Sequence, residues 1–129
     1  MDSSSPSIKM VSSDARGEIY VVTLPGDREL LLLHSVAGTL RGGHSHDVDE
    51  VVTVLSGELV YHKLEKGGGE QLSMLRAGET SFNKAGEVHM GEFITDVWLT
   101  EWKIAAHKGT WSNKDYAPWR EKVLAHAHS

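Results

Sequence analysis

Residues 38–50 read Gly-Thr-Leu-Arg-Gly-Gly-His-Ser-His-Asp-Val-Asp-Glu, with histidines at positions 44 and 46 and a glutamate at position 50. On a β-strand, His44 and His46 point to the same face, about 7 Å apart along the chain. Two imidazoles on one face can bind a single ion. On a continuing strand Glu50 would lie about 13 Å further on. We therefore expect a turn at Asp47-Val48-Asp49 that pairs the next strand with the first and returns the Glu50 carboxylate to the site.

A fourth ligand has to come from a distant part of the chain, and His89 is the best candidate. It comes just after the turn-forming residues 84–87 and shortly before Gly91. Three imidazoles and one carboxylate suit one divalent transition metal per chain, namely Fe, Mn, Ni, Co, Cu or Zn. Such a set leaves positions free for water or substrate on an octahedral metal, which is typical of a catalytic rather than a closed structural site.

These residues resemble the first motif of the cupin family. That motif is a Gly, five residues, His-x-His, three or four residues, Glu, six residues and Gly. All of its fixed positions are filled, by Gly38, His44, His46, Glu50 and Gly57.

The second cupin motif is a Gly, five residues, Pro-x-Gly, two residues, His, three residues and Asn. Gly78, Gly86 and His89 match it, whereas Lys84 stands where Pro is usual and Phe93 where Asn is usual. Neither departure removes a metal ligand, but they change the expected turn and the polarity around the site. The motifs cover residues 38–93, and the strand pattern extends the resemblance to 17–105.

The cupin resemblance implies an all-β fold, a double-stranded β-helix (jelly-roll) barrel with the metal in one mouth. It also implies a homodimer, since many small cupins pair through their sheets. A shorter likeness, over Arg41–His46 and Leu55–Glu58, is to the nucleotide-sugar isomerases and epimerases among cupins.

The strand pattern predicts the same class, because short apolar segments alternate with turns every eight to twelve residues. We expect strands at Ile19–Leu24, Glu29–Val36, Glu50–Leu55, Glu58–Leu64, Gln71–Leu75 and Val97–Ile104. We expect a flexible N-terminal tail over residues 1–14, the barrel over 15–106 and a partly helical C-terminal extension over 107–129. The helix would run from about Tyr116 to His126, capped by Asn113 or Asp115.

No general acid or base can be assigned from the sequence, but four side chains are candidates. They are His34, Tyr61, His62 and Glu101. His34 is alternatively a core histidine, and Tyr61 and His62 point to opposite faces of one strand. Glu101 and Lys103 alternate with Trp98 and Trp102, so the inner face of that strand decides which pair reaches a cavity.

Three residues are candidates for substrate binding. The guanidinium of Arg41 can bind a carboxylate or phosphate through two parallel hydrogen bonds, although a surface salt bridge explains it equally well. Trp98 and Trp102 could form the wall of an apolar pocket, but a place in the core or in a dimer interface is the favoured interpretation.

The composition excludes several functional classes. The net charge of -5 argues against nucleic acid and anionic membranes as partners, and the absence of cysteine excludes disulfides and thiolate chemistry. The N-terminus lacks the pattern of a signal peptide, so we expect a cytoplasmic protein. The sequence predicts a metal-dependent enzyme acting on a small oxygenated substrate, either a dioxygenase or an isomerase/lyase. The alternative is a non-catalytic cupin that binds a metal and a small ligand such as a sugar or organic acid.

Overall fold

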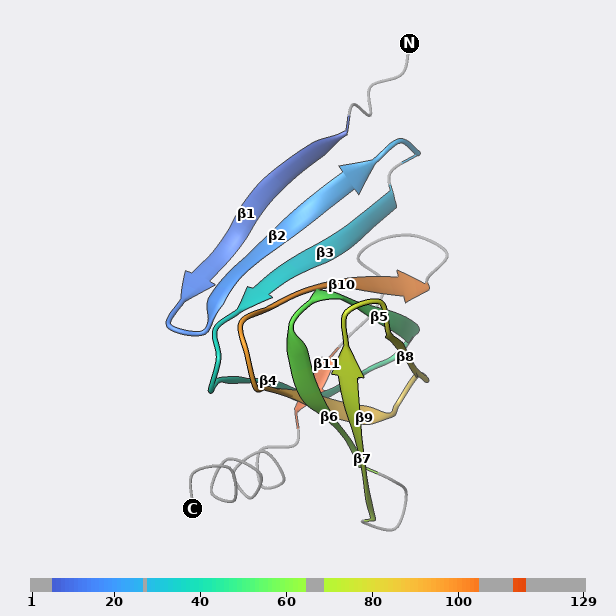
Figure 1. Ribbon diagram of the computed structural model, residues 1–129. Coiled ribbons are helices and arrows are strands. Elements are labelled where there is room, and N and C mark those ends of the chain that lie inside the picture. Colours follow the sequence, from blue (N-terminus) through green and yellow to red (C-terminus); the bar gives the residue numbers. More distant parts are fainter. Residues whose placement is uncertain (1–5, 27, 65–68, 105–112, 116–129) are drawn as a thin grey trace.

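The computed structural model describes residues 6–26, 28–64, 69–104 and 113–115 of the 129-residue chain. Every regular element in these ranges is a β-strand, and the strands form two antiparallel sheets (Figure 1). No helix in these ranges is long and apolar enough to cross a membrane. The prediction of an all-β fold is confirmed.

The first sheet has six strands. In spatial order they are β1 (Ser7–Asp14), β2 (Gly17–Leu24), β3 (Arg28–Ser35), β10 (Val97–Ile104), β5 (Asp49–Ser56) and β8 (Thr80–Asn83). The second sheet has five strands. In spatial order they are β11 (Asn113–Asp115), β4 (Leu40–His46), β9 (Val88–Phe93), β6 (Glu58–Leu64) and β7 (Glu70–Arg76).

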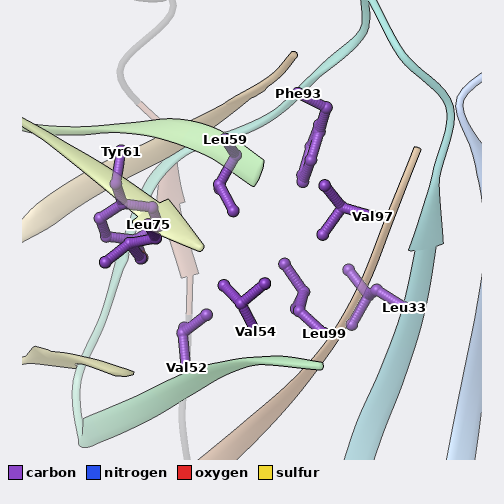
Figure 2. Packing of buried hydrophobic residues seen from close by; sticks show 9 residues of the cluster. All are labelled: Leu33, Val52, Val54, Leu59, Tyr61, Leu75, Phe93, Val97 and Leu99. Atoms are coloured by element: carbon purple, nitrogen blue, oxygen red, sulfur yellow. The ribbon is translucent and has the colours of Figure 1, made fainter. Parts of the chain in front are cut away.

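The hydrophobic core lies between the two sheets (Figure 2). β5 contributes Val52 and Val54, which are fully buried and alternate along the strand as a half-buried strand requires. β6 contributes Leu59 from the opposite sheet, also fully buried. Apolar side chains from both sheets thus meet in one core, and the residues of the candidate site line the part of this interior beside it.

The predicted hairpin between His46 and Glu50 is wrong. β4 pairs with β9 and β11, whereas β5 pairs with β10 and β8, so the chain changes sheets at Asp47 and Val48. The loop between β8 and β9 forms hydrogen bonds with the residues on either side of this change of sheet. The amide of Gly86 donates to the His46 carbonyl (2.7 Å), and the amide of Ala85 donates to Asp49 Oδ1 (2.8 Å). In the first sheet, β5 turns Val52 and Val54 toward the core between the sheets.

The interpretation of residues 1–14 as a tail is wrong for Ser7–Asp14, which form the edge strand β1. This strand pairs with β2, from Ser7 opposite Thr23 to Asp14 opposite Gly17. Its side chains are almost all exposed. Its apolar residues, Ile8, Met10 and Val11, are all more than half exposed, so the strand is held by its pairing with β2 rather than by a buried face.

The predicted helix cap at Asn113 or Asp115 is also wrong. These residues belong to β11, where Asn113 pairs with His46 and Asp115 with His44. The helix expected from about Tyr116 to His126 lies outside the described residues.

Candidate metal centre

Three histidines from two neighbouring strands form a compact cluster. His44 and His46 lie on β4, and His89 lies opposite His44 on β9. One ring nitrogen from each lies within 4.8 Å of the other two. This spacing is compatible with one shared metal ion, which imidazole nitrogens bind at about 2.0–2.1 Å.

A glycine bulge in β4 allows this arrangement. The pairing of β4 with β9 shifts by one residue between Gly42 and His44, so that His44 and His89 are paired directly. Gly42 has φ +101°, and a Cβ atom there would lie 2.9 Å from the His89 carbonyl oxygen. Only glycine fits such a backbone approach without displacing β9.

Glu50 approaches the cluster from the opposite sheet. Its Oε1 lies 3.2 Å from His89 Nε2, and its Oε2 lies 3.4 Å from His46 Nε2. The donor atoms that all lie within 4.8 Å of one another are those of the three histidines, and Glu50 contacts two of these residues. The structure thus brings together the four residues that the sequence assigned to the metal.

The carboxylate of Glu50 is fully buried and has two further partners. Lys103 Nζ lies 3.1 Å from its Oε2, and Asn83 Nδ2 donates to its Oε1 (3.1 Å). Burial alone would raise the pKa of Glu50. The close His46 and His89 rings and the charge of Lys103 outweigh burial and hold this pKa well below its ordinary value. The carboxylate is therefore ionised and can serve as a ligand.

The protonation pattern around His89 suits a cation. His89 Nδ1 lies 3.2 Å from the Glu87 carbonyl oxygen, which can only accept, so Nδ1 carries a proton. In a neutral ring the lone pair of Nε2 then faces the Glu50 carboxylate. Both His89 Nε2 and Glu50 Oε2 are buried without a geometrically aligned hydrogen bond from the described residues. A divalent ion between these atoms would satisfy them, so the donor set fits a metal.

A cavity of about 310 Å³ opens onto the cluster. All three histidines line it, together with side chains from both sheets. Its charged and hydroxyl-bearing lining residues are Arg16, Arg41, Tyr61, Glu101 and Lys103. Its apolar lining residues are Ile19, Leu31, Leu33, Val52, Leu59, Phe93 and Leu99. The site is thus a polar cluster beside an apolar wall, the usual composition of a small-molecule site.

Two of the four acid–base candidates line this cavity. Burial, followed by the charge of Glu50, raises the pKa of Glu101 to about 7. Burial also raises the pKa of Tyr61 well above its ordinary value, and its hydroxyl accepts a hydrogen bond from Asn83 (2.6 Å). Glu101 is therefore the candidate that can exchange a proton near neutral pH.

Similar solved structures include several cupin-fold proteins. The capsular polysaccharide assembling protein CapF from Staphylococcus aureus matches 86% of this chain with a TM-score of 0.67 and 19% identity. Bacillus subtilis oxalate decarboxylase, a protein with Mn(II) centres, matches 92% with a TM-score of 0.67 and 18% identity. The protein has the cupin fold. Momordica charantia 7S globulin matches 94% of the chain with a TM-score of 0.68 and 14% identity.

The chain spans about a third of the length of CapF and of oxalate decarboxylase, at 32% and 34% of those chains. No protein-family profile and no curated protein sequence matches it significantly. The similarity to the solved structures therefore defines its fold, and its chemistry has to be argued from its own residues.

The two tryptophans considered for substrate binding lie outside the cavity. Trp98 and Trp102 are 36% and 37% exposed, and neither lines the cavity. Trp98 instead stacks on His34, with ring centroids 4.7 Å apart. The residues that alternate with them, Glu101 and Lys103, face inward. A pocket-wall role for the tryptophans is therefore contradicted.

His34 and His62 also lie outside the cavity. His34 Nδ1 is 3.2 Å from Glu18 Oε1, and His62 Nε2 is 3.0 Å from Glu92 Oε1. His34 Nε2 also lies 4.0 Å from Asp96 Oδ2, so both imidazoles have carboxylate partners away from the cluster. Neither is placed to take a proton from a ligand in the cavity.

Sequence reasoning missed Asn83, which connects Glu50 to Tyr61. It is 1% exposed, and its amide donates to both residues. Phe93, which replaces the usual Asn of the second motif, is buried in the core and lines the cavity. The site thus has an apolar Phe at position 93, where the family usually has Asn, and a buried polar Asn at position 83. The only sequence signal was that Ser81 and Asn83 alternate on one face of β8.

Proposed function

We propose that this cupin is a metal-dependent enzyme that binds a small oxygenated substrate in the cavity beside His44, His46 and His89. The observation that carries the proposal is the convergence of these three imidazoles on one cavity, with the buried Glu50 carboxylate against them. A divalent transition metal held by these residues would act as a Lewis acid toward a carbonyl, enolate or carboxylate oxygen.

Other residues at or beside the cavity would have separate roles in such a reaction. Glu101 supplies a carboxylate to the cavity wall, and we assign it the transfer of a proton to or from the substrate. Lys103 and Asn83 hold the carboxylate of Glu50 in place. Isomerase or lyase chemistry uses this acid–base group directly. A dioxygenase is the other reaction of the proposal.

The test is to identify the bound metal by elemental analysis and then to measure turnover and oxygen uptake with diketones, flavonols and keto-acids. We expect turnover that requires the metal and is lost in Glu50→Ala. Glu101→Gln should lower turnover about 100-fold or more while the metal content is unchanged. Glu92→Gln, on the outer side of the sheet, is the matched control.

Two results would overturn the proposal. Full metal occupancy in a His44→Ala/His46→Ala double variant would exclude this metal site. Tight ligand binding without turnover under any metal would support the alternative, a non-catalytic cupin that binds a metal and a small ligand. The homodimer remains a prediction from the sequence, which light scattering can test. The cytoplasmic location also remains a prediction.

A further inference from the structure

Arg41 is a buried cation with an unused hydrogen-bond donor. Its side chain is 9% exposed, and its Nε donates to the hydroxyl of the fully buried Ser35 (2.7 Å). Its Nη2 is buried and has no hydrogen-bond acceptor among the described residues. A buried guanidinium N–H without an acceptor is unfavourable, because the group has lost its water and gained nothing in return.

The nearby carboxylates are already engaged or lie elsewhere on the cavity wall. Asp14 accepts from Arg16, whose Nη2 lies 2.6 Å from Asp14 Oδ2. Glu18 lies against His34. Glu101 lines the cavity but does not accept a hydrogen bond from Arg41 Nη2. Burial, followed by the charge of Arg16, lowers the pKa of Arg41, although a guanidinium stays charged at any physiological pH. An acceptor for Arg41 therefore has to come from outside this set.

Arg41 lines the same cavity as the three histidines. Arg16 and Lys103 also line it, but each already has a carboxylate partner, Asp14 and Glu50 respectively. The buried charge of Arg41 and its unused donor favour an anionic ligand. The volume of about 310 Å³ is at the lower end for small-molecule sites, so the ligand has few carbon atoms.

We propose that the cavity binds a small organic anion with two polar ends. One end presents oxygen atoms to the three-histidine cluster, and the other is a carboxylate or phosphonate that accepts from Arg41 Nη2. The carbon atoms of the ligand lie on the apolar wall, which includes Leu33 and Leu99. The first part rests on the proposed function, whereas the Arg41 subsite rests on the unused donor and on the buried charge of Arg41.

The test uses probes that have a metal-binding hydroxamate at one end. Monohydroxamates of malonic, succinic and glutaric acid carry a carboxylate at the other end and differ in length. Their carboxamide counterparts are neutral there, and one phosphonate-ended probe separates the two anions. Binding to the metal-loaded protein is measured by calorimetry. Plain succinate, without a chelating end, is measured in parallel.

We expect the best carboxylate probe to bind at least about tenfold more tightly than its carboxamide counterpart. Arg41→Met should abolish this preference, while affinity for the neutral probe stays within about twofold. Arg41→Lys, which keeps the charge but loses the planar fork, should retain part of the preference. Arg76→Met is the matched control, because Arg76 lies outside the cavity on β7 and faces Glu58.

Equal affinity for charged and neutral probes in the unaltered protein would overturn the subsite and leave the metal proposal standing. A preference that persists in Arg41→Met would also overturn it. If succinate binds in an Arg41-dependent manner but no hydroxamate uses the metal, the subsite stands and the proposed function fails. If the phosphonate probe binds more tightly than the carboxylate probe, the anion is a phosphonate or phosphate.

Discussion

Histidines on the inner faces of the sheets share a partner, whereas those on the outer faces have carboxylates of their own. Inside, His46 and His89 both approach Glu50, at 3.4 and 3.2 Å. Outside, His62 has Glu92 to itself at 3.0 Å. The Nε2 atom of His62 thus has its own carboxylate, whereas several imidazoles around one buried carboxylate can accommodate a cation. The sharing of partners, rather than the number of histidines, therefore distinguishes the candidate metal site.

The largest effect is expected from Lys103→Met on the inner face. Removing this ammonium leaves the buried Glu50 carboxylate without its cationic partner, which should cost about 3–5 kcal/mol of unfolding free energy in the metal-free protein. The affinity for a divalent ion should rise at the same time, because the lysine no longer competes for Glu50. Urea denaturation with and without metal measures both effects.

Lys63→Met is the partly exposed control for Lys103→Met. Lys63 lies 3.3 Å from Glu87, is partly exposed and does not line the cavity. Its loss should cost less than about 1 kcal/mol and leave metal affinity unchanged. Equal costs for the two variants would mean that the buried ion pair of Glu50 and the partly exposed pair of Glu87 do not differ.

The next effect is on metal affinity itself. His46→Ala should weaken binding by at least about 100-fold, since even the loss of a group that only orients a ligand costs 10–100-fold. His62→Ala should leave the affinity unchanged. Both variants are made in a background with His126 and His128 replaced by alanine, so that these histidines do not add metal sites. An equal loss of metal affinity in His62→Ala would contradict the proposed difference between the two faces.

Alanine substitutions at two glycines compare the cost at a packed position with the cost at an open turn. Gly42 and Gly78 both have positive φ, but only at Gly42 would an added Cβ atom lie within 3.0 Å of backbone atoms of β9. Alanine should cost about 1–2 kcal/mol at Gly78 for its conformation, and about 1–3 kcal/mol more at Gly42 for the contact. Chemical denaturation measures the difference, and similar costs would show that β4 can move away from β9.

The smallest effect is expected from Trp98→Ala on the outer face of β10. Affinity for the hydroxamate probes should change less than about twofold, because this indole does not reach the cavity. Loss of the stack on His34 should still lower the unfolding free energy by about 1 kcal/mol or more. A tenfold loss of probe affinity at unchanged stability would instead mean that Trp98 contacts the ligand.

The sequence predicted the site better than the strands that carry it. The spacing of the histidines and of Glu50 identified residues that the structure brings together, because ligand spacing follows from the shape of one barrel mouth. Period-two alternation correctly separated Trp98 and Trp102 from Glu101 and Lys103, but it does not say which face is inward. The aromatic face is the outer one because Leu99 and its neighbours fill the space between the sheets.

The errors and omissions concern contacts between distant segments. Glu50 reaches the cluster by a change of sheet rather than by a hairpin, and Asn83 supports it from β8. Neither can be read from local patterns, since both depend on how the two sheets face each other. β1 was missed because serine and aspartate dominate residues 1–14, and its few apolar residues stay exposed on an edge strand.

The origin of Glu50 in one sheet and of the three histidines in the other has a mechanical consequence. The distance between the sheets sets the gap that an ion must fill, and that distance depends on how core residues such as Val54 and Leu59 pack. Shortening or lengthening these side chains should therefore change which ionic radius the protein prefers, without touching a ligand. Conversely, an ion held from both sides would fasten the sheets together, so that resistance to unfolding would report on the metal supply.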